Sequence, residues 1–166
     1  TEVFNHQFVN REAIVKSIPT AYETEIQPND TVVVHHNVFR RWHDVKGRER
    51  NSRSFFNENT YLVKPDQIFL YKRNKDWVAP KGYCFVQPIK QENILSQEKE
   101  KPCVGIIKYT DGAFKKQELV GFTPFSTYEF IIDEKRLYRV MTQFITIKYE
   151  YQGNEKTYNP SWAQSS

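Results

Sequence analysis

The chain has 166 residues, of which 39% are hydrophobic and 15% aromatic, enough for one ordinary folded domain or two small ones. No run approaches the ~18 apolar residues that cross a bilayer, and no charged-then-apolar leader opens the chain. The net charge of +4 is matched by residues 40–53 alone, which carry six cations and two anions. We therefore expect a protein of the cytoplasm, or of a virion assembled inside a cell, with no membrane partner and a local basic loop.

Strand signals dominate the chain. Short runs rich in Val, Ile, Phe, Tyr and Thr occupy residues 31–36, 68–71, 83–86, 104–109, 128–132 and 144–151. Turn residues such as Asp111-Gly112 separate them, and no amphipathic run of helical period extends convincingly beyond about two turns. The pattern predicts an all-β protein made of small barrels or sandwiches.

Three of these segments recur in order along the chain. The matching segments are 13–16 with 105–108, 30–34 with 118–122, and 66–71 with 142–147. Their offsets are 106 − 14 = 92, 120 − 32 = 88 and 143 − 67 = 76 residues, as expected for two copies whose loops differ in length. We predict a first module over residues 1–76, a second over 77–151, and a polar C-terminal tail over 152–166.

The second module resembles the GroES-like co-chaperonin family. It runs from a strand ending in a proline (82–88) through a polar loop to segments 104–107 and 119–122, then a hairpin (128–139) and a closing strand (144–147). The resemblance implies a small, partly open β-barrel that assembles into rings. The first module matches only from Glu12 onward, so its N-terminus is abbreviated or its first strand comes from elsewhere. The expected fold is two tandem GroES-like barrels, with a basic hairpin inserted at 37–55 in the first.

The resemblance also implies a partner-binding loop. In this family a loop after the first strand presents an apolar tripeptide to the chaperonin, and here Ile94 and Leu95 are the only large apolar residues of the matching loop, 90–101. The chain departs from the pattern, because glycine-rich flanks are missing and Ser96 stands where a third apolar residue is common. The alternative is that Ile94 and Leu95 pin the loop onto their own barrel.

The basic insertion is the second candidate site. Five arginines carry it, with Phe39 and Trp42 interleaved: Arg40, Arg41, Arg48, Arg50 and Arg53. They could pair with acidic patches of a neighbouring protein, or meet phosphates and stack on bases. A third interpretation is a solvated hairpin whose charges protect an exposed edge.

Catalysis, metals and cofactors are not expected. The chain has no glycine-rich phosphate loop, no GxSxG and no HExxH. His35 and His36 would point to opposite faces of a strand, and Cys84 and Cys103 are too far apart for a CxxC site. Glu129 and Asp133 are interpreted as solvated hairpin carboxylates.

These features predict a non-catalytic co-chaperonin-like protein that forms a homo-oligomeric ring and docks on a chaperonin. The alternative is a structural virion or assembly protein, such as a phage head, connector or decoration component, that contacts capsid or tail proteins. Nucleic-acid binding through the hairpin is the weaker third hypothesis.

Overall fold

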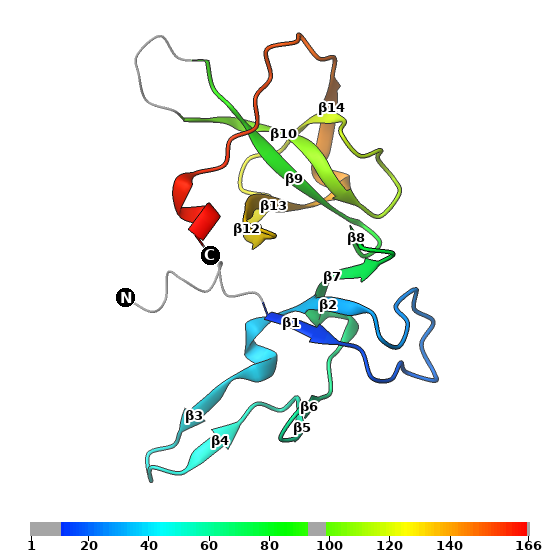
Figure 1. Cartoon of the computed structure of the whole chain (residues 1–166), viewed down its shortest axis with the longest axis vertical. Coiled ribbons are helices and arrows are strands. Elements are labelled where there is room, and N and C mark those ends of the chain that lie inside the picture. The colour runs from blue at the N-terminus through cyan, green and yellow to red at the C-terminus, as the bar shows by residue number, and fades with distance from the viewer. Residues whose placement is uncertain (1–10, 93–98, 166) are drawn as a thin grey trace. The chain divides into compact units, whose positions relative to one another are not determined.

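The computed structural model describes residues 11–92 and 99–165, and this part of the chain is all-β (Figure 1). Its only helical elements are 3-10 turns of three to five residues. The strands are β1 (Arg11–Ile14), β2 (Thr31–Val34), β3 (Arg41–His43), β4 (Glu49–Asn51), β5 (Phe55–Asn57), β6 (Thr60–Tyr61), β7 (Ile68–Arg73), β8 (Asp76–Val78), β9 (Tyr83–Lys90), β10 (Glu100–Thr110), β11 (Leu119–Phe122), β12 (Thr127–Ile132), β13 (Lys135–Met141) and β14 (Ile145–Tyr149). The 3-10 turns are η2 (His36–Phe39), η3 (Pro65–Gln67), η4 (Thr142–Phe144) and η5 (Ser161–Ser165).

The chain divides into two compact units, residues 1–77 and 78–166. The first unit holds a four-stranded sheet in the order β1-β2-β7-β8 and two small hairpins, β3–β4 and β5–β6. The second holds a six-stranded sheet in the order β12-β13-β9-β10-β11-β14. Closure of this sheet would require β12 to pair with β14, and these strands are its two ends. Among the described residues no sheet closes into a barrel, so the two tandem GroES-like barrels expected from the resemblance are not confirmed.

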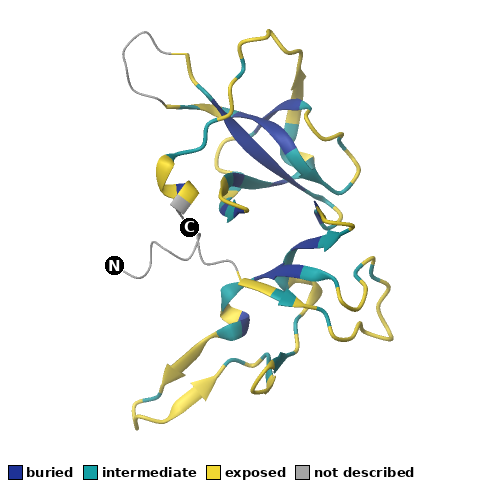
Figure 2. Cartoon of the chain, viewed as in Figure 1, coloured by how far each residue is buried: buried dark blue, intermediate teal, exposed yellow. Residues whose placement is uncertain are grey.

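Strand β9 is the centre of the second unit, and Figure 2 shows it buried along most of its length. It lies between β10 and β13, both antiparallel to it. Alternation along the strands separates two apolar clusters. The larger contains Val86, Ile107, Val120, Phe122 and Val140, and the smaller contains Ile89, Val104, Ile106 and Leu119.

The two units share one pattern of strand pairing. In the first, Ala13 of β1 lies opposite Val32 of β2; in the second, Gly105 of β10 lies opposite Val120 of β11. These pairs reproduce the offsets of 92 and 88 residues found in the sequence. All the strand pairs concerned are antiparallel, with β7 next to β2 and β14 next to β11.

The same irregularity interrupts the next pairing in each unit. One residue of the outer strand is skipped, Phe69 in β7 and Thr146 in β14. The flanking pairs are Val33–Leu70 and Val34–Ile68 in the first unit, and Gly121–Ile147 and Phe122–Ile145 in the second. Bulges of this kind fix the local bend and twist of a sheet, so the two sheets bend at matching positions.

Matching hydrogen bonds continue into the flanking turns. A 3-10 turn precedes the outer strand in both units, and its last carbonyl accepts a backbone bond: Gln67 from His35 at 2.9 Å, and Phe144 from Thr123 at 3.1 Å. Gln67 therefore corresponds to Phe144. The offset here is 144 − 67 = 77, one residue more than the sequence comparison predicted.

The C-terminal segment, expected as a polar tail, is part of the second unit. Thr157 bridges to Ile89 of β9, Lys90 donates its backbone N–H to the Lys156 carbonyl (2.7 Å), and Tyr158 donates to the Pro88 carbonyl (2.8 Å). Farther on, η5 contacts β13, and Ala163 within it is fully buried. We call residues 156–165 the C-terminal strap.

Candidate interaction site

The basic insertion folds as a two-stranded hairpin, β3–β4, that projects from the first unit (Figure 1). Its tip is closed by Asp44, whose carboxylate accepts the backbone N–H groups of Lys46 (2.9 Å) and Arg48 (3.0 Å). Gly47 takes the left-handed backbone conformation (φ 72°) that the turn requires. Every residue of both strands is exposed (Figure 2), so this hairpin is a surface feature with no core of its own.

Its base is held by the first unit. Val38 of the preceding turn is fully buried, and Ser52 donates its hydroxyl to the Val38 carbonyl (2.5 Å). Phe39 packs edge-to-face on Tyr61 at 4.8 Å. Phe39 therefore belongs to the anchored base, whereas Trp42, the other aromatic residue among these arginines, is exposed.

The predicted arginines divide into paired and available groups. Arg50 forms an ion pair with Asp44 (3.1 Å), and Arg41 forms one with Glu49 (3.7 Å). Arg40 lies 5.6 Å from the Trp42 ring in a cation–π contact. No ion pair is seen for Arg48 or Arg53 in the part of the chain that the structure describes. The hairpin thus keeps an excess of positive charge after its internal pairs are formed.

Local hydrogen bonds fix two of the hairpin charges. The backbone N–H of Arg48 and then that of Lys46, together with the Arg50 side chain, lower the pKa of Asp44. A side-chain hydrogen bond with Tyr61 raises the pKa of Arg41. Both groups are therefore charged at neutral pH, and the hairpin can act as a cationic arm toward an acidic partner.

The other predicted contact residues, Ile94 and Leu95, lie outside the described residues. The described residues on either side of them form a closed neck, in which Gln91 donates its backbone N–H to the Lys99 carbonyl (2.7 Å). Beside it, the Asn154 amide donates to the Glu92 carboxylate (2.6 Å). The loop therefore leaves from β9 and returns to β10 at a fixed base.

A partly buried polar cluster at this base was not anticipated from the sequence. Arg136 of β13 forms ion pairs with Glu100 of β10 and with Glu129 of β12. Tyr138 donates its hydroxyl to Glu100 (2.6 Å), and the Arg136 guanidinium also lies over the Tyr138 ring at 4.9 Å. Burial and then the hydrogen bond to Glu100 raise the pKa of Tyr138, so the phenol is neutral at physiological pH.

The cluster corrects the interpretation of Glu129 as a solvated carboxylate. Glu129 lies opposite Tyr138 in the β12–β13 hairpin, and Arg136 is its diagonal neighbour on the same face. Opposite charges at diagonal positions of a hairpin were a usable signal for this pair. Glu100 had no such signal, because 36 residues separate it from Arg136.

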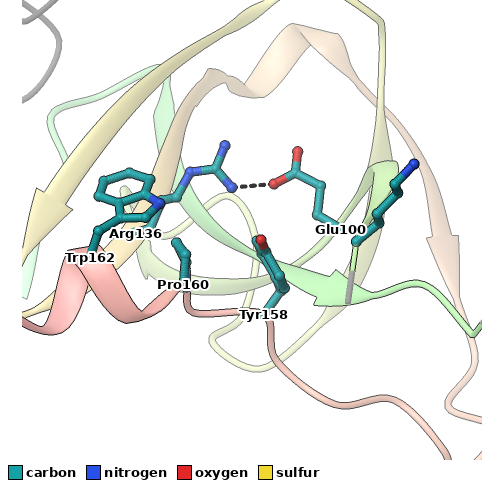
Figure 3. Close-up of a pocket in the computed structure, with 6 residues that line it drawn as sticks. Glu100, Arg136, Tyr158, Pro160 and Trp162 are labelled. Carbon is teal, nitrogen blue, oxygen red and sulfur yellow. Dashed lines mark hydrogen bonds and ion pairs between the residues drawn. The ribbon is translucent and has the colours of Figure 1, made fainter. Parts of the chain in front are cut away.

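The strap closes one side of this cluster and forms a shallow pocket of about 430 Å³ (Figure 3). Its lining residues are Lys99, Glu100, Arg136, Tyr158, Pro160 and Trp162. Asn159 positions the strap, because its side chain accepts the Arg136 backbone N–H (3.1 Å) and donates to the Glu134 carbonyl (3.0 Å). We call this the strap pocket.

Metal-binding groups do not gather in the described ranges. No three His, Cys, Asp or Glu side chains there could hold one ion. His35 and His36 stack on each other at 4.4 Å, because β2 ends at Val34 rather than at His36 as predicted. Over the same ranges no helix has the length and apolar character to cross a membrane.

Comparison of the chain with protein-family models, with curated proteins and with solved structures found no match.

Proposed function

We propose that this chain is a non-catalytic, co-chaperonin-like protein made of two divergent copies of one β unit. It assembles as a homo-oligomeric ring in the cytoplasm and docks on a chaperonin through the loop that contains Ile94 and Leu95. The observation that carries this proposal is the common register of β1-β2-β7 and β10-β11-β14, including the same skipped residue. A matching irregularity at a matching position favours duplication over chance.

Duplication also bears on which unit carries the proposed docking loop. The second unit has β9 and the β12–β13 hairpin in addition to the shared strands. In the described part of the first unit, β1 is an edge strand of its sheet, and no strand takes the place that β9 has beside β10. In the part of the chain that the structure describes, a loop between a β9-type and a β10-type strand is therefore seen in the second unit. We place the proposed docking role there.

The proposed docking needs no covalent chemistry. Two apolar side chains on a polar loop can bury their surface in a groove of the partner, at about 25 cal/mol per Å². The hydrogen bond between Gln91 and Lys99 holds the two ends of this loop together.

The double variant Ile94→Ser, Leu95→Ser is expected to lose chaperonin binding and to keep its fold, because the change removes only the apolar contact. Co-sedimentation with a purified chaperonin measures binding, and circular dichroism measures the fold. Val45→Ser, at the fully exposed tip of the basic hairpin, is the matched control and should bind normally. Normal co-sedimentation of the double variant would remove the docking hypothesis.

A second candidate function is that of a structural virion or assembly protein that contacts capsid or tail proteins. The observation that favours it is the cationic β3–β4 hairpin, which lies between β2 and β7 in the chain and forms a separate two-stranded sheet. Between the corresponding strands of the second unit, β11 and β14, the chain instead forms the β12–β13 hairpin, which is paired with β9 in the main sheet. A projecting arm with available arginines fits an acidic surface on a neighbouring protein. Nucleic-acid binding through the same arm is the weaker version.

Replacing Arg48, Arg50 and Arg53 by Gln is expected to weaken contact with an acidic protein partner and to leave stability nearly unchanged, since all three residues are exposed. Co-assembly with purified head or tail proteins measures the contact, with Lys81→Gln, Lys101→Gln as the control. Fluorescence anisotropy with a single-stranded oligonucleotide tests the nucleic-acid version, in which affinity falls steeply with salt. Unchanged co-assembly and unchanged anisotropy would exclude a binding role for these arginines.

A further inference from the structure

Phe125 occupies an unfavourable position in the second unit. It lies in the turn from β11 to β12, after Pro124, where Ser126 donates its hydroxyl to the Thr123 carbonyl (2.5 Å). Its backbone is left-handed (φ 60°), and its side chain is fully exposed. Glycine or asparagine is preferred at such a turn position, and a bulky residue there is an outlier.

The side chain of Phe125 therefore contributes nothing to the packing of its own unit, and its backbone conformation costs free energy, on the order of 1 kcal/mol. Strained residues of this kind concentrate at functional positions. An aromatic ring presented at the tip of a fixed turn suits insertion into a pocket of a partner.

The strap pocket is a matching receptor. Its rim carries two aromatic side chains and a proline, and Trp162 is 47% exposed. Arg136, ion-paired with Glu100 and Glu129, also lines the pocket (Figure 3). At about 430 Å³ the pocket has room for a phenyl ring, which can stack on the indole and meet the guanidinium face.

Phe125 cannot reach the pocket of its own chain. The β12–β13 hairpin places Thr127 opposite Val140 at one end, and Ile131 opposite Arg136 near the other. At about 3.3 Å per residue, the turn with Phe125 and the pocket are roughly 20 Å apart along the hairpin. A phenyl ring spans only a fraction of that distance, so any occupant of this type must come from another molecule.

We infer that Phe125 of one copy of this chain inserts into the strap pocket of a second copy. The inference deepens the self-assembly part of the proposed function by naming its contact. The Phe125 side chain, which we call the knob, and the strap pocket are different surfaces at opposite ends of one hairpin. The contact is therefore head-to-tail. Repetition of such a contact generates a ring if the rotation closes, and a filament if it does not.

The test uses two variants of the full chain, each of which removes one side of the contact. Phe125→Gly removes the knob and relieves the left-handed strain, and Trp162→Ala opens the pocket. Each is expected to weaken self-association by about tenfold or more in sedimentation velocity, as for a central aromatic contact. Phe125→Gly should also unfold at an equal or higher temperature than the unmodified chain at a dilution where both are monomeric.

Mixing the two variants gives the decisive result. Phe125→Gly still has a pocket and Trp162→Ala still has a knob, so a one-to-one mixture should form a heterodimer that grows no further. An unmodified chain that is monomeric at every concentration, variants that assemble normally, or a mixture that stays monomeric would each overturn the inference. If Trp162→Ala does not fold, Tyr158→Ala supplies the second pocket variant.

This experiment and the chaperonin assay can fail separately. Phe125 and Trp162 lie outside the docking loop, so their variants keep Ile94 and Leu95. If the chain self-associates through Phe125 but does not co-sediment with a chaperonin, the docking proposal fails and this inference stands. If the chain co-sediments with a chaperonin but Phe125 makes no self-association contact, this inference fails and the docking proposal stands.

Discussion

Replacing Arg136 by Met is expected to destabilise the second unit by about 3–5 kcal/mol, because it leaves two largely buried carboxylates without their cation. The Arg136 side chain is 13% exposed, and those of its partners Glu129 and Glu100 are 15% and 27% exposed. Urea denaturation followed by fluorescence measures the effect. Trp162 is the one of the chain's three tryptophans that lies in this unit, so only part of the emission change reports on it.

The pH dependence of this loss separates charge from packing. Without Arg136, partial burial penalises the charged forms of the two carboxylates and no cation offsets that penalty. The loss should therefore be large near neutral pH and smaller near pH 4, where protonation removes the uncompensated charge. A loss that does not change with pH would mean that packing of the arginine chain, rather than its charge, is what matters.

A matched control is Arg50→Met in the basic hairpin, which breaks the exposed pair with Asp44. The Arg50 side chain is 54% exposed, so the expected change is less than about 1 kcal/mol.

Replacing Gly105 by Ala is expected to destabilise the second unit by about 1–3 kcal/mol, because a Cβ there would lie 2.8 Å from the Gln87 carbonyl oxygen and 3.3 Å from its carbonyl carbon. Both atoms belong to the backbone of β9, the central strand, so relief requires that strand to move. Urea denaturation under the same conditions measures the loss. A neutral Gly105→Ala would show that β9 and β10 separate at low cost.

The first unit supplies the control for this substitution. Ala13 stands at the position equivalent to Gly105, and no described strand lies on that side of β1. The converse change, Ala13→Gly, should cost only the roughly 0.5–1 kcal/mol of added backbone freedom. The exposure of neighbouring residues follows the same logic: Ile14 is 72% exposed, whereas its equivalent Ile106, covered by β9, is 5% exposed.

The all-β class and most of the second sheet could be predicted from the sequence, because strand patterns depend on local alternation. The predicted strand 83–86 continues to Lys90, however, through a proline that usually ends a strand. The Pro88 carbonyl accepts from Tyr158 of the strap. In an antiparallel strand the N–H and C=O of one residue face the same side, so the N–H that Pro88 lacks would face the strap rather than β10. That partner is 70 residues away and leaves no local trace.

The short elements could not be predicted for a related reason. Strands β5, β6 and β8 are two or three residues long, too short for periodicity to appear. The strap was expected to be a tail because its composition is polar. Its pairing with β9 is made by backbone groups, and side-chain composition gives no information about backbone hydrogen bonds.

The candidate sites differ in the same way. The basic hairpin could be located from sequence because its charges are clustered in one segment, and the five predicted arginines are exposed in the structure. The strap pocket could not, because Glu100, Arg136 and Trp162 come from three segments that only the folded sheet brings together. Phe125 gave no signal, since its left-handed backbone is a property of the folded turn.

The pairing of β9 with residues 156–158 has a consequence for biosynthesis. Domains generally fold from the N-terminus during translation. All the described strands of the first unit have been synthesised once Val78 has been added. The second unit is different, because the part of β9 from Pro88 to Lys90 stays open on one side until residues 156–158 have been made. Its native state can form only after the C-terminal strap has left the ribosome, so a product that stops before the strap would expose that edge to its neighbours.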